Sequence, residues 1–153
     1  MISRHSQAGR VEWIGVRPDR KQPMAVLDQV DIRNDGLVGD RRTTPGKRAV
    51  TLIQHEHLPV IAALSGHDEI DPQTLRRNIV VSGINLLGLR NTTFRVGDVV
   101  LQGTGICAPC SRMEEALGHG GYSAMRGHGG ITASVVDEGT VQIGDKVELH
   151  TIK

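Results

Sequence analysis

The stretch FRVGDVVL (residues 94–101) occurs a second time, in looser form, as VQIGDKVEL (residues 141–149). In both copies a Gly-Asp pair separates two short runs that are rich in valine, isoleucine and leucine. Such runs favour β-strands, and the glycine supplies the positive φ that a tight turn between them needs. Each copy therefore predicts two strands joined by a turn, which concerns the fold and not the chemistry.

The rest of the chain extends this β-rich pattern. Its apolar segments are short, β-branched and punctuated by glycine, which is typical of strands. The segments that we expect to form strands are residues 11–16, 24–27, 49–53, 79–81, 96–101, 131–136 and 147–152.

Only three segments are expected to be helical. Residues 54–64 carry apolar residues at helical spacing and stop at Ser65-Gly66, and Asp71 precedes a proline in what would be the first turn of a short helix. Ser111 and Glu114 fit a capping box, which predicts a helix that begins just after Cys110 and ends at Gly118. The strands are not separated by regular helices, which argues against a doubly wound sheet. We therefore expect a mainly β fold, a closed or nearly closed β-barrel with a few short helices, as a single domain over residues 1–153.

Composition excludes several classes of function. The chain has 153 residues, a net charge of only +1 and three aromatic residues, so dedicated binding of nucleic acid is not expected. No apolar run approaches the roughly 20 residues that span a bilayer, and the first five residues do not open a signal peptide. We expect a cytoplasmic protein with no membrane partner, whose core consists of valine, isoleucine, leucine and alanine.

The two cysteines form the sharpest chemical feature, the sequence Cys107-Ala-Pro-Cys110. Cys110 directly precedes the third predicted helix, and a position at a helix N-terminus favours the thiolate. A redox pair, a zinc site and a single functional thiolate at Cys110 are the functional interpretations, beside an inert core cysteine. The residue types alone leave these alternatives open.

A glycine-rich segment, residues 118–130, is long for a connection and is expected to be either mobile or wrapped around a ligand. Its His128 is a candidate proton donor.

Glycine spacing excludes the two common phosphate-binding loops, because Gly46-Lys47 is followed by Arg48 where a hydroxyl residue is required. Asp40 follows a glycine and is interpreted as a turn-capping residue. His55 and His57 are two residues apart and are interpreted as surface histidines.

Six motifs occur in the order found in the MOSC family, and the resemblance covers about residues 11–149. The sequence resembles the C-terminal domain of molybdenum-cofactor sulfurases, standing alone. The motifs are GLVGDR (36–41), RRNI (76–79), FRVGDVVL (94–101), CAPC (107–110), GGI (129–131) and IGD (143–145).

This resemblance implies a mostly β barrel that binds molybdenum cofactor (molybdopterin) or carries sulfur on a cysteine. Cys110 matches the family's key cysteine, which would ligate molybdenum or bear a persulfide. The resemblance implies cofactor binding by Arg76 and Asn78 of the Arg-x-Asn motif and by Arg41. Arg48 and Arg77 are further candidates, because a guanidinium suits a phosphate group.

Three functional hypotheses follow. The first is a reductase of N-hydroxylated compounds with a Cys110-ligated molybdenum. Because the chain has only two cysteines, it cannot hold a Cys-ligated iron–sulfur cluster. This reductase would therefore need a separate electron-donor protein. The second is a non-catalytic module that carries sulfur as a Cys110 persulfide, received from a desulfurase, or that delivers the cofactor. The third is a structural β-barrel with a buried cysteine.

Overall fold

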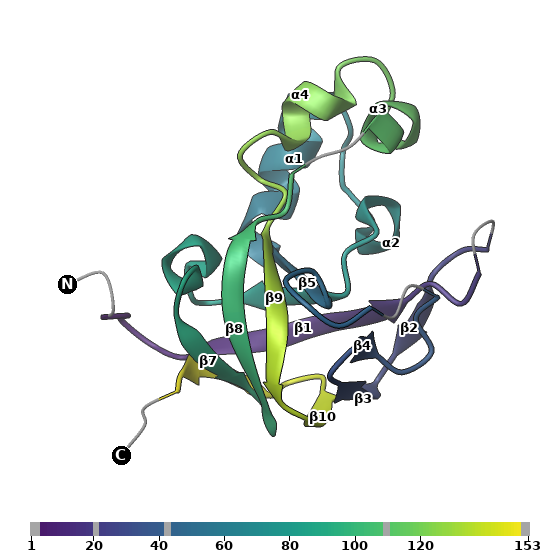
Figure 1. Cartoon of the computed structure of the whole chain (residues 1–153). Coiled ribbons are helices and arrows are strands. Elements are labelled where there is room, and N and C mark those ends of the chain that lie inside the picture. Colours follow the sequence, from purple (N-terminus) through teal and green to yellow (C-terminus); the bar gives the residue numbers. More distant parts are fainter. Residues whose placement is uncertain (1–3, 20–21, 42–43, 109–110, 151–153) are drawn as a thin grey trace.

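The computed structural model describes residues 4–19, 22–41, 44–108 and 111–150. The strands of its main sheet are β1 (Gly9–Val16), β2 (Ala25–Leu27), β5 (Val50–Gln54), β6 (Ile79–Ser82), β7 (Thr93–Val96), β8 (Val99–Ile106), β9 (Ile131–Asp137) and β11 (Lys146–Leu149). Their order is β11-β7-β8-β9-β5-β6-β1-β2, and β11 also pairs with β1. In the part of the chain that the structure describes, seven strands therefore close into a barrel, and β2 adds to it beside β1 (Figure 1). The prediction of a mainly β barrel is confirmed.

A second, smaller sheet lies beside the barrel. It contains β3 (Gln29–Arg33), β4 (Gly36–Leu37) and β10 (Gly139–Gln142), in the order β10-β3-β4. The sequence analysis did not predict β3 and β4. The alternation of buried and exposed residues along β3 is regular, but it comes from only two apolar residues, Val30 and Ile32, too few to distinguish a strand from a loop.

The two Gly-Asp copies have different outcomes. The first copy is an antiparallel hairpin of β7 and β8, in which Phe94 is opposite Leu101. The second copy is not a hairpin, because β10 pairs with β3 while β11 pairs with β1 and β7. A Gly-Asp turn can join strands of two different sheets just as well, since the turn itself contains no information about which strand becomes the neighbour.

The two turns also contact each other. The Gly97 amide donates to the Lys146 carbonyl oxygen at 3.1 Å, and the Asp98 amide donates to the Thr140 carbonyl oxygen at 3.3 Å. Gly97 has a φ of +58°, and a Cβ at this position would overlap the Asp145 carboxylate. Glycine is therefore required at residue 97 both by the turn and by the second turn packed on it.

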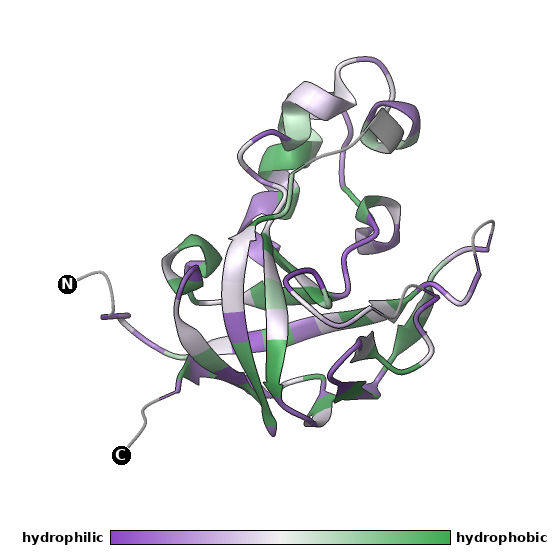
Figure 2. Cartoon of the chain, viewed as in Figure 1, coloured by the Kyte–Doolittle hydropathy of each residue, from purple (hydrophilic) through white to green (hydrophobic). Residues whose placement is uncertain are grey.

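Aliphatic side chains fill the barrel. Hydrophobic and hydrophilic residues alternate along its strands in Figure 2, as expected when one face of each strand points inward. Phe94 is the one aromatic residue in this core cluster, so the predicted aliphatic core is confirmed within the described residues. The largest fully buried members of this cluster are Ile14, Ile32, Leu37, Leu52, Ile79, Leu86, Leu89, Phe94 and Leu101.

Helical segments gather at one end of the barrel (Figure 1). They are η1 (His55–His57), α1 (Leu58–Ser65), α2 (Pro72–Leu75), α3 (Ser111–Leu117) and α4 (Gly121–Met125), while η2 (Leu86–Leu89) precedes β7. β5 and β6 are parallel, and the chain between them, which includes η1, α1 and α2, is the crossover that parallel neighbours require.

Alternation along β5 and β6 decides what these helices pack against. Ile79 and Val81 point into the barrel, whereas Val80 belongs to a second hydrophobic cluster outside it. This cluster joins the barrel wall to α1, α2, α3 and α4, and a single pair of strands thus has two buried faces. Its buried members are Ile53, Leu58, Ile61, Leu75, Val80, Met113, Leu117 and Met125.

The helix predictions were largely confirmed. Asp71 accepts a hydrogen bond from the Gln73 amide at 3.0 Å as the N-cap of α2, and Gly66 ends α1 with a φ of +76°. The first helix begins later than predicted, at Leu58, because residues 55–57 form a 3-10 turn. Residues 118–130, which we expected to be either mobile or wrapped around a ligand, contain the short helix α4.

Glu114 explains why this segment folds back. Its carboxylate accepts hydrogen bonds from the Gly120 and Tyr122 amides, both at 3.0 Å, and these bonds lower the pKa of Glu114. The predicted capping residue of α3 therefore supplies acceptors to the first turn of α4. No helix of the described residues is long and apolar enough to cross a membrane.

We predict that Gly130→Ala destabilises the barrel much more than Gly127→Ala does. Both glycines have a positive φ, +88° and +85°, so each alanine carries backbone strain of about 1 kcal/mol. Only at Gly130 would the new Cβ meet backbone atoms, those of Leu52 and Ile53 on β5, whereas nothing lies within 4 Å at Gly127. Denaturant unfolding should show a further loss of about 2 kcal/mol for Gly130→Ala. Equal losses for the two variants would contradict this account of the β5 contact.

Candidate functional site

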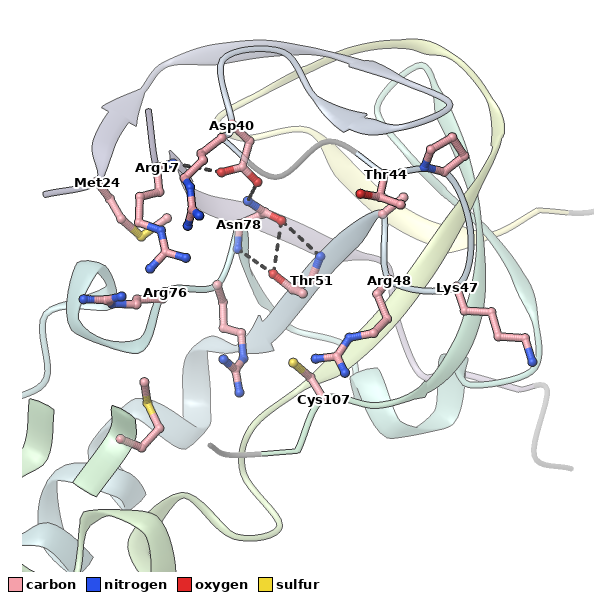
Figure 3. Close-up of a pocket in the computed structure, with 15 residues that line it drawn as sticks. Arg17, Met24, Asp40, Thr44, Lys47, Arg48, Thr51, Arg76, Asn78 and Cys107 are labelled. Carbon is pink, nitrogen blue, oxygen red and sulfur yellow. Dashed lines mark hydrogen bonds between the residues drawn. The ribbon is translucent and has the colours of Figure 1, made fainter. Parts of the chain in front are cut away.

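A cavity of about 720 Å³ lies at the end of the barrel that carries α2 and α3. Its wall contains residues that follow β1, β4 and β8 and residues that precede β2, β5 and β6. Segments that are far apart in the sequence therefore meet here. The lining residues are Arg17, Met24, Asp40, Arg41, Thr44, Pro45, Lys47, Arg48, Ala49, Thr51, Arg76, Arg77, Asn78, Cys107 and Met113 (Figure 3).

The cavity is strongly cationic. Among the described lining residues there are six cations and a single carboxylate, that of Asp40. The whole chain has a net charge of only +1, so this excess is local. A concave site of one sign of charge attracts a ligand of the opposite sign, which here is an anion. The cations are Arg17, Arg41, Lys47, Arg48, Arg76 and Arg77.

Arg77 is the buried member of this set. The residue is only 7% exposed. Its Nε donates to the Gly129 carbonyl oxygen at 2.8 Å, and its Nη1 donates to the Leu75 carbonyl oxygen at 3.1 Å. Nη2 is buried and has no hydrogen-bond partner among the described residues. A buried guanidinium nitrogen without a partner is costly, and Arg77 is one of the residues that line the cavity.

Arg76 lies next to it in an uncommon backbone conformation. Its φ is +58°, in the left-handed region, where it ends α2. Such a φ costs a non-glycine residue roughly 1 kcal/mol or more and is enriched at functional sites. The side chain is exposed at the cavity and points toward the same space as Arg17 in Figure 3.

Asp40 attaches the β4 end of the wall to the end of β1. Its Oδ1 accepts a hydrogen bond from the Arg17 amide at 3.0 Å, and the Arg41 amide donates to the Arg17 carbonyl oxygen at 2.6 Å. Arg17 and Arg41 are thus held beside each other by their own backbone. The interpretation of Asp40 as a cap of its own turn was incomplete, because its carboxylate accepts hydrogen bonds from Arg17, which follows β1, and from Asn78, which precedes β6.

Asn78 is the centre of the polar network (Figure 3). Its Nδ2 donates to the Gly15 carbonyl oxygen and to Asp40 Oδ2, both at 3.2 Å. Its Oδ1 accepts from the Thr51 amide at 3.2 Å and from Thr51 Oγ1 at 3.1 Å. These bonds use both amide hydrogens and both lone pairs, so we assign Asn78 to positioning the wall.

The loop that carries Lys47 and Arg48 is fixed from the barrel side. Thr104 Oγ1, on β8, donates to the Lys47 carbonyl oxygen and lies 2.8 Å from Thr132 Oγ1, on β9. Arg48 is exposed at the cavity and extends toward Cys107 in Figure 3.

Cys107 supplies the sulfur of a thiol to the wall. It is a free cysteine, 2% exposed, and its amide donates to the Gly130 carbonyl oxygen at 2.9 Å. Cys110, the predicted metal-ligating residue, lies outside the described residues, three positions further along the chain. Its role stays a prediction.

His128 is not among the lining residues, although it was a candidate proton donor. It packs against His57 in an edge-to-face arrangement, with ring centroids 5.1 Å apart. Burial lowers the pKa of His57, and the neighbouring His128 lowers it further, while Glu56 acts in the opposite direction. The described geometry therefore gives His128 a neighbour on η1 and not a place at the cavity.

The structure thus brings together Arg41, Arg48, Arg76, Arg77 and Asn78, all five of the residues that the sequence analysis selected for cofactor binding. Sequence reasoning missed Arg17 and Lys47, and it considered Cys107 only together with Cys110, never as a functional thiol by itself. Arg17 directly follows a predicted strand, but many surface arginines do, so its position gave no usable signal.

Comparison with known proteins agrees with this architecture. The family model for the MOSC domain matches residues 34–148. The chain belongs to the MOSC family. Among solved structures, this MOSC protein is similar to YuaD from Bacillus subtilis, with a TM-score of 0.83 at 20% identity, covering 96% of this chain and 98% of that one.

It is also similar to YiiM from Escherichia coli, with a TM-score of 0.72 at 19% identity, and to YiiM from Geobacillus stearothermophilus, with 0.75 at 15% identity. Each alignment covers 94% of this chain, and 71% and 75% of the other chains. At such identities the likeness establishes the fold alone. No curated protein matches the sequence.

We predict that Asn78→Ala lowers the free energy of unfolding by about 2–4 kcal/mol, because it removes the side-chain hydrogen bonds to Asp40 Oδ2, to Thr51 and to the Gly15 carbonyl oxygen. Asn34→Ala is the matched control, since Asn34 is exposed in the turn between β3 and β4. Denaturant unfolding measures both. A loss as small as that of the control would show that the network does not hold the wall together.

We predict that acid destabilises the fold through His57. Its pKa is lower in the folded chain than in the unfolded one, so its contribution is complete above the unfolded pKa of about 6.5 and is lost as the pH falls through the lowered folded value. Unfolding of the parent should therefore become easier between about pH 7.5 and about pH 5.5. His57→Gln should reduce this change, whereas His119→Gln, at a fully exposed position, should not. Identical pH profiles for His57→Gln and the parent would refute the prediction.

Proposed function

We propose that this MOSC protein binds a phosphorylated molybdenum cofactor in its cationic cavity. The observation that carries the proposal is Arg77, whose buried Nη2 lacks a partner among the described residues while five further cations surround the same cavity. An anionic group of the ligand would satisfy that nitrogen and balance the local charge. The volume, about 720 Å³, lies within the range usual for sites of small molecules and cofactors.

The donors present fit such a group. The described residues do not gather three or more histidine, cysteine or acidic side chains that could hold a bare metal ion. A metal that arrives inside its own organic ligand needs fewer protein donors, and a thiolate is a suitable soft one. Arg41, Arg48, Arg76 and Arg77 would hold the phosphate and the polar pterin, and Cys110 would ligate the molybdenum. When bound, the cofactor supplies two-electron redox chemistry.

The activity that we propose for the loaded protein is reduction of N-hydroxylated compounds, with electrons from a separate donor protein. The residues around the cavity then bind and orient the cofactor and attract anionic groups. The alternative is a carrier that holds the cofactor, or a Cys110 persulfide received from a desulfurase, without turnover. The cationic cavity supports both, because each requires an anion to be held beside a cysteine.

The test is the cofactor content of protein produced in a host that makes molybdenum cofactor. We expect the parent to contain molybdenum and pterin, the latter detected by its fluorescence, in near-equal amounts. The content of both should be about tenfold lower in Arg76→Gln, because one charge-assisted hydrogen bond contributes roughly 1.5–3 kcal/mol. Arg95→Gln is the control, since Arg95 is exposed on β7 away from the cavity lining. Parent protein without molybdenum or pterin would refute cofactor binding.

Turnover separates the two functions. Loaded protein is mixed with a chemically reduced dye and an aromatic amidoxime, and the amidine product is measured. Product formation that is lost in Cys110→Ala supports the reductase, and loaded protein without product supports the carrier.

A further inference from the structure

We propose that Cys107 is a second reactive thiol, one that accepts sulfane sulfur from a small oxyanion donor such as thiosulfate. The proposed function assigns chemistry only to Cys110, whereas Cys107 is the cysteine that the structure places in the cavity wall. The inference concerns the cofactor-free protein and does not depend on cofactor binding.

A two-glycine strip, Gly129-Gly130, joins Cys107 to the buried arginine. The Gly129 carbonyl oxygen accepts from Arg77 Nε at 2.8 Å, and the Gly130 carbonyl oxygen accepts from the Cys107 amide at 2.9 Å. A Cβ on Gly129 would contact both the Cys107 carbonyl oxygen and Arg77 Nη2. The Cys107 backbone and the unpartnered Nη2 of Arg77 therefore both lie next to one glycine.

This arrangement selects the chemical class of the donor. Arg77 Nη2 is a cationic donor in a residue that is 7% exposed, and Arg48 extends toward Cys107 in Figure 3. A thiol that shares a cavity wall with two guanidinium groups can receive a small dianion whose oxygens bind the cations while its terminal sulfur faces the thiol. Thiosulfate has both parts. Burial of Cys107 limits access to what the cavity admits, which favours a small donor over a protein surface.

The reaction balances without an external oxidant. The Cys107 thiol releases its proton to solvent, and its sulfur attacks the terminal sulfur of thiosulfate. A new S–S bond forms on Cys107, the S–S bond of thiosulfate breaks, and sulfite leaves with the electron pair of that bond. The guanidinium groups stabilise the negative charge of the departing sulfite. A nucleophile such as cyanide can then remove the terminal sulfur as thiocyanate and restore the thiolate.

The experiment uses full-length protein from a host that lacks molybdenum-cofactor synthesis. Parent, Cys107→Ser and Cys110→Ser are incubated with thiosulfate, and mass spectrometry measures the addition of one sulfur atom. Thiocyanate release after cyanide is the second readout. We expect Cys110→Ser to retain loading and release, and Cys107→Ser to lose at least about nine-tenths of both. Loading of Cys107→Ser at the parent level, or no loading of the parent, would overturn the proposal.

A second comparison tests the cations. Arg77→Gln and Arg48→Gln should each load about tenfold more slowly with thiosulfate, but neutral iodoacetamide should alkylate their Cys107 at the parent rate with release of iodide, because only thiosulfate carries charge. Arg48 is exposed, so its variant remains informative should Arg77→Gln fold poorly. Arg95→Gln is the matched control. Equal rates for variants and parent with thiosulfate would overturn the role of the cations. Failure of cofactor binding leaves each of these readouts unchanged, so the two proposals fail separately.

Discussion

The amide of Asn78 is the constraint on which the site depends. It lies directly before β6 and hydrogen-bonds to Gly15 on β1, Asp40 after β4 and Thr51 on β5. The Asn78 carbonyl oxygen also accepts from the Gly15 amide at 2.8 Å. One buried side chain with every hydrogen-bonding group used therefore fixes several chain segments at one point. Because each of these segments carries an arginine toward the cavity or lies next to one, the network sets the positions of the charges as well as those of the strands.

Concentrating positive charge in this way opposes folding. The cationic residues repel one another, and among the described residues the cavity wall contains only Asp40 to compensate. Arg77 adds the cost of a buried, unpartnered nitrogen, and Arg76 adds a strained backbone. The aliphatic barrel and the second cluster under the helices supply the stability that tolerates these features. Unfavourable groups that are concentrated at one cavity, and not spread over the surface, are typical of a binding site.

The helical end completes the site from the other side. Residues 118–130 leave α3, form α4 and return along Gly129-Gly130 to the barrel, where these two glycines meet Arg77, Cys107 and Leu52. Glu114 holds the first part of this path, and the close backbone approach at Gly130 fixes the last part. The segment that connects two secondary-structure elements thereby becomes part of the wall that holds the buried arginine.

The sequence by itself determined the strands with several β-branched residues, the glycine-punctuated turns, the caps of α1 and α2 and the cavity arginines within the MOSC motifs. These features are local, since period-two alternation, a cap or a Gly-Asp turn is complete within a few residues. It could not determine that the second Gly-Asp copy joins two sheets, that Asp40 bonds to Arg17 and Asn78, or that Arg17 and Lys47 face the cavity. Tertiary structure alone decided these points, because each depends on which distant backbone becomes the neighbour. Barrel closure between β1 and β11 sets those neighbours, and it joins residues more than 130 positions apart.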